Sequence, residues 1–203
     1  MGKLYFRYGA MNSGKSTSLM QVAYNYEERG MKVLIIKPMT DKKGGDKLLS
    51  RLGVERSVDL VIRDEQNIYD SIKKLQDEQD DIHCILADEV QFFKKHHIDE
   101  LFKIAVLLDI PVICYGLRTD FLMNGFEGSE RLLLLAHSIE EMKTICTCGR
   151  KAVLNGRKIN GKYVFKGEQV AIDLIDNVEY QSLCGQCYFK YLKESEMDKQ
   201  LSK

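Results

Sequence analysis

The sequence has no excess of charge of either sign. Its 203 residues carry 30 Lys and Arg against 30 Asp and Glu, and the calculated isoelectric point is about 6.9. A neutral chain offers no strong electrostatic attraction to the phosphate backbone of nucleic acid. We therefore expect no nucleic-acid partner.

Long apolar runs and targeting segments are also missing. No run approaches the ~20 apolar residues that cross a bilayer, and the N-terminus starts with strand-like residues, not with a basic stretch followed by an apolar one. We expect no membrane association and a cytoplasmic location. Internal repeats and low-complexity tracts are absent from the sequence, and the length suits one domain, or one domain with a small appendage.

The most informative segment is a phosphate-binding loop near the N-terminus. It follows strand-like residues 4–8 and precedes helix-like residues 17–28, which is the context this motif requires. Its glycines let successive backbone N–H groups point at phosphate oxygens, and the following helix N-terminus adds a favourable dipole. A Gly/Ser turn before a helix is the simpler alternative. We expect a nucleoside triphosphate to bind here, on Gly9, Ala10, Met11, Asn12, Ser13, Gly14, Lys15 and Ser16.

Strand-like and helix-like patterns alternate through about residue 141. Short apolar strands are expected at 32–37, 82–87 and 111–115, helices at 66–79 and 98–108, and a loop at 39–50. Helices between short apolar strands imply a parallel sheet with right-handed crossovers. The predicted fold class is therefore α/β, a P-loop (RecA-like) parallel sheet flanked by helices, over residues 1–141.

Asp88 and Glu89 follow the strand-like run 82–87. Ligands of open α/β sheets bind at the carboxyl ends of strands. An Asp in this position can support Mg²⁺, and an adjacent Glu that points elsewhere can act as a general base toward an acceptor hydroxyl. Two solvated acids at the start of a loop would look the same, but the upstream phosphate loop favours the functional interpretation.

The six cysteines fall into two groups. Cys84 and Cys114 lie in apolar runs and are expected to be buried thiols. The other four form two pairs next to turn residues and are expected to bind a structural Zn²⁺, although only one residue separates the first pair. The ligands are Cys146, Cys148, Cys184 and Cys187. The zinc module is predicted over 142–192, with short strands at 162–165 and 169–174, and the charged tail 193–203 as a frayed helix end or a disordered segment.

Taken together, these motifs resemble the cytosolic (type II) thymidine kinase family over nearly the whole chain, to about residue 190. The resemblance rests on the phosphate loop and on three further stretches in the same order. These are Asp88-Glu-Val-Gln-Phe-Phe93, Tyr115-Gly-Leu-Arg-Thr-Asp-Phe121 with Phe126-Glu-Gly-Ser129, and Tyr180-Gln-Ser-Leu-Cys184 with Cys187-Tyr-Phe-Lys190.

The resemblance implies a reaction and a set of roles. ATP would phosphorylate the 5′-hydroxyl of thymidine, and of deoxyuridine, with Glu89 as general base, Lys15 stabilising the transferred group and Mg²⁺ on Ser16 and Asp88. It also implies a nucleoside partner, a homotetramer, and feedback inhibition by the downstream triphosphate. The nucleotide site would extend over Asp88, Glu89, Val90 and Gln91. The nucleoside site would comprise Met11, Phe92, Leu117, Phe121, Phe126, a covering loop at Ala171, Ile172, Asp173, Leu174 and Ile175, and Tyr180.

The sequence departs from the family pattern in three places. The covering loop lacks the usual Gly-Gly pair, Asn155 stands where Thr is common near the base, and Asp41-Lys-Lys43 replaces Asp-Thr-Arg. Asn has both a donor and an acceptor, so hydrogen bonding to the base could differ. Lys43 would contribute a point charge in place of a bidentate Arg, and Arg51 could compensate.

The main alternative is a P-loop ATPase with a zinc ribbon that acts on nucleic acid. It shares the phosphate loop and the strand-end acid, but the neutral charge and the lack of a basic stripe disfavour it. A GTP-binding switch is a weaker alternative. Residues 41–44 fit a DxxG pattern, but no Asn-Lys-x-Asp sequence is present to read guanine.

Overall fold

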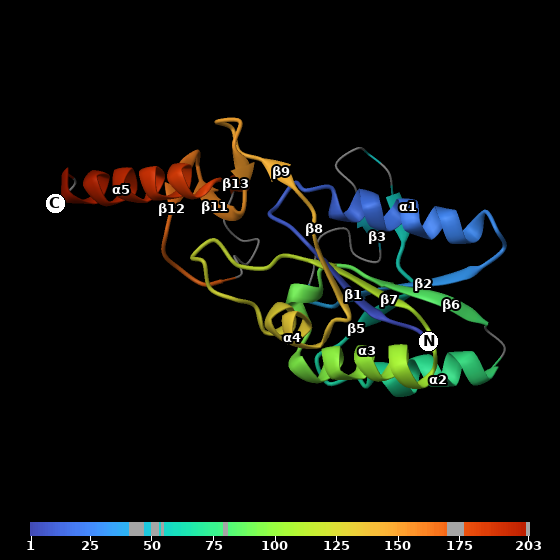
Figure 1. Cartoon of the computed structure of the whole chain (residues 1–203). Coiled ribbons are helices and arrows are strands. Elements are labelled where there is room, and N and C mark those ends of the chain that lie inside the picture. The colour runs from blue at the N-terminus through green and yellow to red at the C-terminus, as the bar shows by residue number, and fades with distance from the viewer. Residues whose placement is uncertain (41–46, 50–52, 54, 79–80, 170–176, 202–203) are drawn as a thin grey trace. The chain divides into compact units, whose positions relative to one another are not determined.

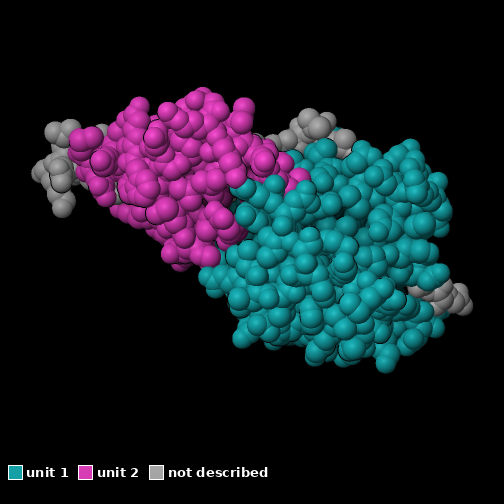
Figure 2. Space-filling model, in the orientation of Figure 1, with its two compact units in different colours: residues 1–8, 14–117, 126–141 teal, residues 9–13, 118–125, 142–203 magenta. Residues whose placement is uncertain are grey.

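The computed structural model describes residues 1–40, 47–49, 53, 55–78, 81–169 and 177–201. The chain divides into two compact units, coloured separately in Figure 2. Unit 1 comprises residues 1–8, 14–117 and 126–141, and unit 2 comprises residues 9–13, 118–125 and 142–203. The chain therefore passes between the units five times, and the second of these passages divides the phosphate loop.

Unit 1 is built on a six-stranded sheet in the order β5-β2-β6-β7-β1-β8, and every neighbouring pair is parallel. The predicted α/β fold class with a parallel sheet is confirmed. The strands are β1 (Leu4–Tyr8), β2 (Lys32–Pro38), β5 (Leu60–Ile62), β6 (Ile82–Ala87), β7 (Val112–Gly116) and β8 (Ser138–Glu141).

Helices cover both faces of this sheet (Figure 1). Helix α1 (Lys15–Glu27) lies on one face, and α2 (Ile68–Glu78), α3 (Lys95–Leu107) and α4 (Glu127–Leu135) lie on the other. Burial on both faces explains why the central strands read as continuous apolar runs. All five residues of β7 are buried, as are six of the seven in β2. The core of the second face joins β1, β6 and β7 to apolar residues of α2 and α3, such as Ile72 and Leu101.

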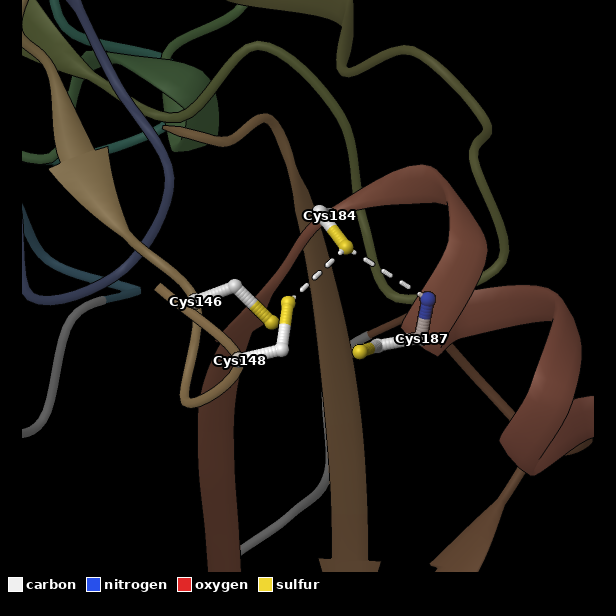
Figure 3. A group of neighbouring side chains, drawn as sticks. All are labelled: Cys146, Cys148, Cys184 and Cys187. Atoms are coloured by element: carbon white, nitrogen blue, oxygen red, sulfur yellow. Dashed lines mark hydrogen bonds between the residues drawn. The ribbon is translucent and has the colours of Figure 1, made fainter. Parts of the chain in front are cut away.

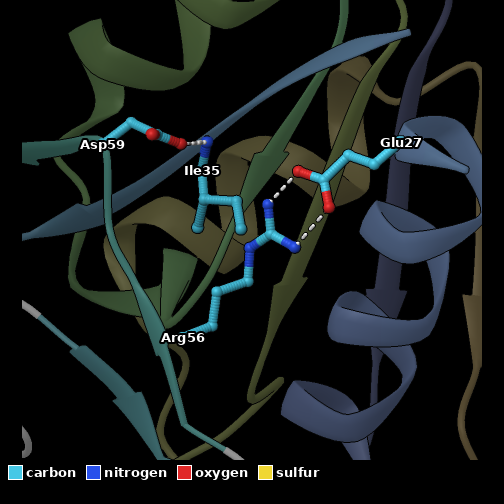
Figure 4. Close-up of polar contacts among 4 residues, drawn as sticks. All are labelled: Glu27, Ile35, Arg56 and Asp59. Carbon is cyan, nitrogen blue, oxygen red and sulfur yellow. Dashed lines mark hydrogen bonds and ion pairs between the residues drawn. The ribbon is translucent and has the colours of Figure 1, made fainter. Parts of the chain in front are cut away.

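The sequence did not predict the short strands of unit 1 that lie outside the central apolar runs. Strands β3 (Lys47–Leu49) and β4 (Glu55–Ser57) form an antiparallel hairpin, and β3 falls inside the stretch expected to be a loop. Arg56 of β4 forms a bidentate ion pair with Glu27 at the end of α1, and Asp59 accepts a hydrogen bond from the Ile35 backbone at 2.7 Å (Figure 4). These polar contacts fasten the region that follows β2 to α1 and to the sheet.

Unit 2 contains a two-stranded sheet, β9 (Thr144–Ile145) with β10 (Lys151–Ala152), and a three-stranded antiparallel sheet in the order β12-β11-β13. The three strands are β11 (Leu154–Ile159), β12 (Lys162–Val164) and β13 (Val178–Leu183). The buried core of this region is small and consists of Cys146, Ala152, Leu183, Cys184 and Tyr188. The strand expected at 162–165 is found, whereas most of the one expected at 169–174 lies outside the described residues.

The last helix, α5 (Gly185–Leu201), continues well beyond the position where the tail was expected to begin. The charged residues from Lys193 to Leu201 are therefore helical. No described helix is long and apolar enough to span a membrane.

Candidate active site

The second half of the phosphate loop lies in unit 1, where it starts α1. Gly14 takes the N-cap position with φ 76°, a left-handed conformation that glycine adopts without strain. Its carbonyl accepts the Ser18 N–H at 2.9 Å, which begins the helix. Helix N-termini of this kind present backbone N–H groups and a favourable dipole to anions.

Beside this helix N-terminus lies Asp88, directly after β6. The Ser16 hydroxyl donates to Asp88 Oδ2 at 3.2 Å, so the two expected magnesium ligands are in contact. Asp88 is only 2% exposed. Burial, and then the neighbouring Glu89 carboxylate, raise the pKa of Asp88 to about 7, while Lys15 and Ser16 act in the opposite direction. A buried carboxyl group beside a hydroxyl suits a hard cation such as Mg²⁺, so the donor set fits the ion expected from the sequence.

Glu89 occupies a strained backbone position. Its φ is 48° and its ψ is 38°, in the left-handed region that non-glycine residues seldom adopt. Its N–H donates to Asp88 Oδ1 at 3.0 Å, and the short 3₁₀ helix η1 (Val90–Phe92) follows. Such strain persists where surrounding contacts impose it and is concentrated at active sites.

Gln91 connects Glu89 to the end of β7. Its side-chain Nε2 donates to Glu89 Oε2, and its Oε1 accepts the Leu117 N–H at 3.0 Å. The side chain is 2% exposed and lies against Gly116, where an added Cβ would stand 2.8 Å from Gln91 Oε1. The sequence placed Gln91 in the nucleotide site. In the structure both ends of its amide contact protein groups.

The first half of the phosphate loop belongs to unit 2. An added Cβ at Gly9 would stand 2.4 Å from Ser13 Oγ and 2.6 Å from the Met142 carbonyl oxygen, so this close approach requires glycine. The Met11 N–H donates to Asn155 Oδ1 at 2.8 Å, and the Met11 carbonyl accepts from Ser182 Oγ at 2.6 Å. Asn155 and Ser182 are paired residues of β11 and β13. Two neighbouring strands therefore hold one residue of the loop, Met11, through both its backbone N–H and its carbonyl oxygen.

The family resemblance implies that Asn155 lies near the nucleobase, and the structure shows which protein groups its side chain contacts. Its Nδ2 donates to the Thr119 carbonyl at 3.1 Å, so both ends of this buried amide hydrogen-bond to backbone. In the structure this side chain therefore joins the phosphate loop to the segment that contains Thr119, both within unit 2.

The expected nucleoside residues are distributed over both units. In unit 1, Phe92 and Phe126 pack edge-to-face with ring centroids 5.8 Å apart, and Leu117 is buried with its carbonyl accepting from Ser129 Oγ at 2.5 Å. In unit 2, Phe121 is 1% exposed and Tyr180 lies half-buried in β13. The covering-loop residues 171–175, and the departures at 41–43 and 51, lie outside the described residues.

The four clustered cysteines converge in unit 2 (Figure 3). Their sulfur atoms all lie within 4.8 Å of one another, and Cys148 Sγ and Cys184 Sγ are 3.6 Å apart. Sulfur atoms at about 2.3 Å from a tetrahedral Zn²⁺ stand roughly 3.8 Å from each other. The tight spacing of the first pair therefore does not prevent convergence, and the set fits a closed zinc site without an open coordination position.

Three residues with positioning roles were not singled out from the sequence, although two of them lie in the segments that carry the family resemblance. Ser182, Arg157 and Tyr188 make contacts with residues far away in the sequence, which periodicity and spacing do not reveal. Only the nearness of Ser182 and Tyr188 to the second cysteine pair could have drawn attention to them.

Comparison with known proteins gives a consistent result. The family model described as thymidine kinase matches residues 2–188. A thymidine kinase of Streptococcus gordonii is 44% identical over 94% of this chain and 97% of the relative. A thymidine kinase of Mannheimia succiniciproducens is 47% identical over 91% of this chain and 93% of the relative. A thymidine kinase of Vibrio vulnificus is 46% identical over 93% and 97%. Among solved structures, a replication initiator DnaA bound to AMPPCP and single-stranded DNA matches with a TM-score of 0.43 and 18% identity over 70% of this chain and 41% of that chain, a likeness that carries no functional argument.

Proposed function

The chain belongs to the thymidine kinase family, and we propose that it uses ATP to phosphorylate the 5′-hydroxyl of thymidine, and of deoxyuridine, giving ADP and the monophosphate. The observation that carries this proposal is the grouping of Lys15, Ser16, Asp88 and Glu89 at the carboxyl ends of β1 and β6 in unit 1. Such a group supplies charge stabilisation, a cation site and a base, which are the requirements of phosphoryl transfer.

In this proposal Gly9–Ser16 binds the phosphates of ATP. The backbone N–H groups at the start of α1 and the Lys15 ammonium stabilise negative charge on the transferred group, which is the main catalytic contribution in such reactions. Ser16 and Asp88 would hold Mg²⁺, which when bound neutralises phosphate charge. The raised pKa of Asp88 is consistent with a carboxyl group that is poorly stabilised as an anion until a cation arrives.

Glu89 is the proposed general base. It would accept the proton of the 5′-hydroxyl as that oxygen attacks the γ-phosphate. The Gln91 amide donates to one carboxylate oxygen of Glu89 and so leaves the other available to the substrate. A carboxylate fixed in this way requires little reorganisation when the hydroxyl arrives.

The aromatic and apolar residues Phe92, Leu117, Phe121 and Phe126 are the proposed walls of the nucleobase site, because a flat pyrimidine requires apolar contact with a few polar groups. Tyr180, Met11 and the loop 171–175 complete the proposed set. The cysteine quartet would hold Zn²⁺ as a structural ion, since four thiolates leave no position for substrate.

The direct test is to measure ADP release from Mg-ATP with thymidine, deoxyuridine, deoxycytidine and single-stranded DNA in parallel. Thymidine-dependent turnover with thymidine 5′-monophosphate as the product is expected. Turnover with deoxycytidine alone would contradict the substrate assignment. Stimulation by DNA without any response to nucleosides would contradict the kinase proposal. The homotetramer implied by the resemblance also stays a prediction, and light scattering of the purified protein tests it.

A further inference from the structure

The segment Arg118–Gly125 of unit 2 is a closed loop with its own internal order. Thr119 and Gly125 form an antiparallel bridge at its base. The Asp120 carboxylate accepts the backbone N–H groups of Leu122 and Asn124, each at 2.8 Å. The loop presents Phe121, a proposed wall of the nucleobase site, from this turn. Its internal hydrogen bonds fix its shape but do not fasten it to the rest of unit 2.

Side chains from elsewhere in unit 2 hold the loop in place. Asn155 donates to the Thr119 carbonyl at 3.1 Å, Tyr188 donates to the Phe121 carbonyl at 2.8 Å, and Gln169 donates to the Gly125 carbonyl at 3.0 Å. These three contacts all reach backbone oxygen atoms. They position the course of the loop without specifying where the Phe121 ring lies.

Arg157 of β11 contacts the ring itself. The centre of its guanidinium lies 3.7 Å from the Phe121 ring centroid, well inside the range of a cation–π interaction. The same guanidinium donates to the Lys166 carbonyl at 2.6 Å and to the Glu168 carbonyl at 2.9 Å. Gly167 lies between these two acceptors with φ 105°, and a Cβ added there would stand 2.8 Å from an Arg157 nitrogen.

The environment of Arg157 is costly for a cation. The residue is 4% exposed, and none of the described carboxylates forms an ion pair with it. Its Nε is the only buried side-chain nitrogen or oxygen among the described residues that has no hydrogen-bond partner. A buried polar group left unsatisfied costs free energy, so the guanidinium is not explained by stability alone. The planar group does fit between an aromatic face and two carbonyl oxygens, which an apolar side chain or Lys cannot reproduce.

We propose that Arg157 is a positioning residue for nucleoside recognition, because it fixes the Phe121 ring on one side and the Lys166–Glu168 turn on the other. The inference rests on the proposed function, in which Phe121 contacts the nucleobase. Arg157 itself touches no substrate. It determines whether the Phe121 ring is in place before the nucleoside binds. Losing the Arg157 side chain therefore lowers the affinity for the nucleoside and leaves the affinity for ATP unchanged.

The kinetic test compares Arg157→Gln and Arg157→Lys with Lys158→Gln as the matched control. Lys158 is the next residue of β11, and its ammonium lies over Tyr163 at 4.8 Å instead of over Phe121. For Arg157→Gln we expect the KM for thymidine to rise at least tenfold, with the KM for ATP changed less than twofold and the zinc content unchanged. Arg157→Lys should recover part of the loss because it keeps the charge but not the planar fork, and Lys158→Gln should behave as wild type.

A second measurement does not depend on activity. Hydrogen exchange in the substrate-free protein should become faster in residues 118–125 of both Arg157 variants and stay unchanged at residues 14–16 and 88–91. If wild type fails to phosphorylate thymidine while exchange changes as expected, the proposed function fails but the positioning role stands. Unchanged exchange in 118–125, or equal changes in the two KM values, would overturn the inference. If Arg157→Gln does not fold, Arg157→Lys decides on both measurements.

Discussion

Gln91 connects two parts of the proposed active site. The family resemblance implies that it belongs to the nucleotide site, and in the structure its amide joins the Glu89 carboxylate to the Leu117 backbone within unit 1. The proposed base and one wall of the proposed nucleobase site therefore share one side chain. A sequence pattern shows that an amide is present but not which groups it bonds.

Replacing Gln91 by Leu should impair catalysis more than nucleotide binding. The change leaves Glu89 without its donor and the buried Leu117 N–H without an acceptor. Since a hydrogen bond to a charged group contributes about 1.5–3 kcal/mol, kcat should fall by roughly tenfold to a hundredfold. Steady-state kinetics and ATP affinity measure the two effects separately. Gln21→Ala, which removes an exposed helix contact, is the control, and an unchanged kcat in Gln91→Leu would contradict the role.

The raised pKa of Asp88 predicts that the stability of the protein depends on pH in the absence of Mg²⁺ and nucleotide. Its pKa rises from the ordinary 3.8 to about 7 because of burial and then Glu89, so the fold favours the neutral acid. The stability that this group contributes is therefore complete below pH 3.8 and is lost as the pH rises through 7. Each pKa unit corresponds to about 1.4 kcal/mol, so the full loss in the free energy of unfolding is at most roughly 4 kcal/mol.

Urea unfolding between pH 5 and pH 8 tests this expectation. Wild type should lose stability across the range, and Asp88→Asn, which cannot ionise, should lose less. Added Mg²⁺ with nucleotide should remove most of the difference, because the cation stabilises the carboxylate. Parallel pH profiles for the two proteins without Mg²⁺ would contradict the raised pKa.

Among the helices and strands, the sequence predicted those that have a clear hydrophobic pattern. The strand expected at 82–87 agrees with β6 at both ends, and the helix expected at 66–79 differs from α2 by only a few residues. Strands β3 and β4 were not predicted, because they are three residues long and mostly polar. Their position depends on pairing with each other and on the contact of Arg56 with α1, neither of which leaves a periodic pattern.

Breaking the pair between Arg56 and Glu27 should have a small, measurable effect. The two side chains are 26% and 40% exposed, and partly exposed pairs contribute about 1 kcal/mol or less. Arg56→Met should therefore lower the free energy of unfolding by up to about 1 kcal/mol in urea denaturation, and salt should reduce the difference. Lys47→Met is the control within the same hairpin, because the Lys47–Glu55 pair is more exposed, at 58% and 55%. If Arg56→Met lowered the free energy of unfolding by more than about 2 kcal/mol, the pair would contribute more stability than an exposed salt bridge does, and the expectation would be wrong.

At the scale of the whole molecule, the chain builds its two units from interleaved segments. Residues 9–13 and 118–125 belong to unit 2 although they lie within the stretch expected to form the kinase core. The sequence predicted both the metal module and the phosphate loop. It did not predict that strands of the module would hold part of that loop, because contacts such as Asn155 with Met11 join residues more than a hundred positions apart.

Removing zinc should therefore affect more than the cysteine cluster. The core around the four thiols is small, and modules of this kind depend on their metal for folding. We expect one zinc per chain by elemental analysis, and loss of the three-stranded sheet and of nucleotide affinity after chelation or in Cys184→Ser. Cys114→Ser, a buried cysteine of β7 outside the cluster, should keep its zinc. Full stability and nucleotide affinity without zinc would refute the structural role.

The most direct test of the proposed catalytic role of Glu89 is thymidine phosphorylation by Glu89→Gln, with ATP affinity determined on the same preparation. The variant keeps the size of the side chain and the whole phosphate loop but removes the proposed base. A general base contributes about 10²–10⁴-fold, so kcat should fall by that factor while ATP binds as in wild type. Thymidine turnover close to wild type in Glu89→Gln would contradict the assignment and place the base elsewhere.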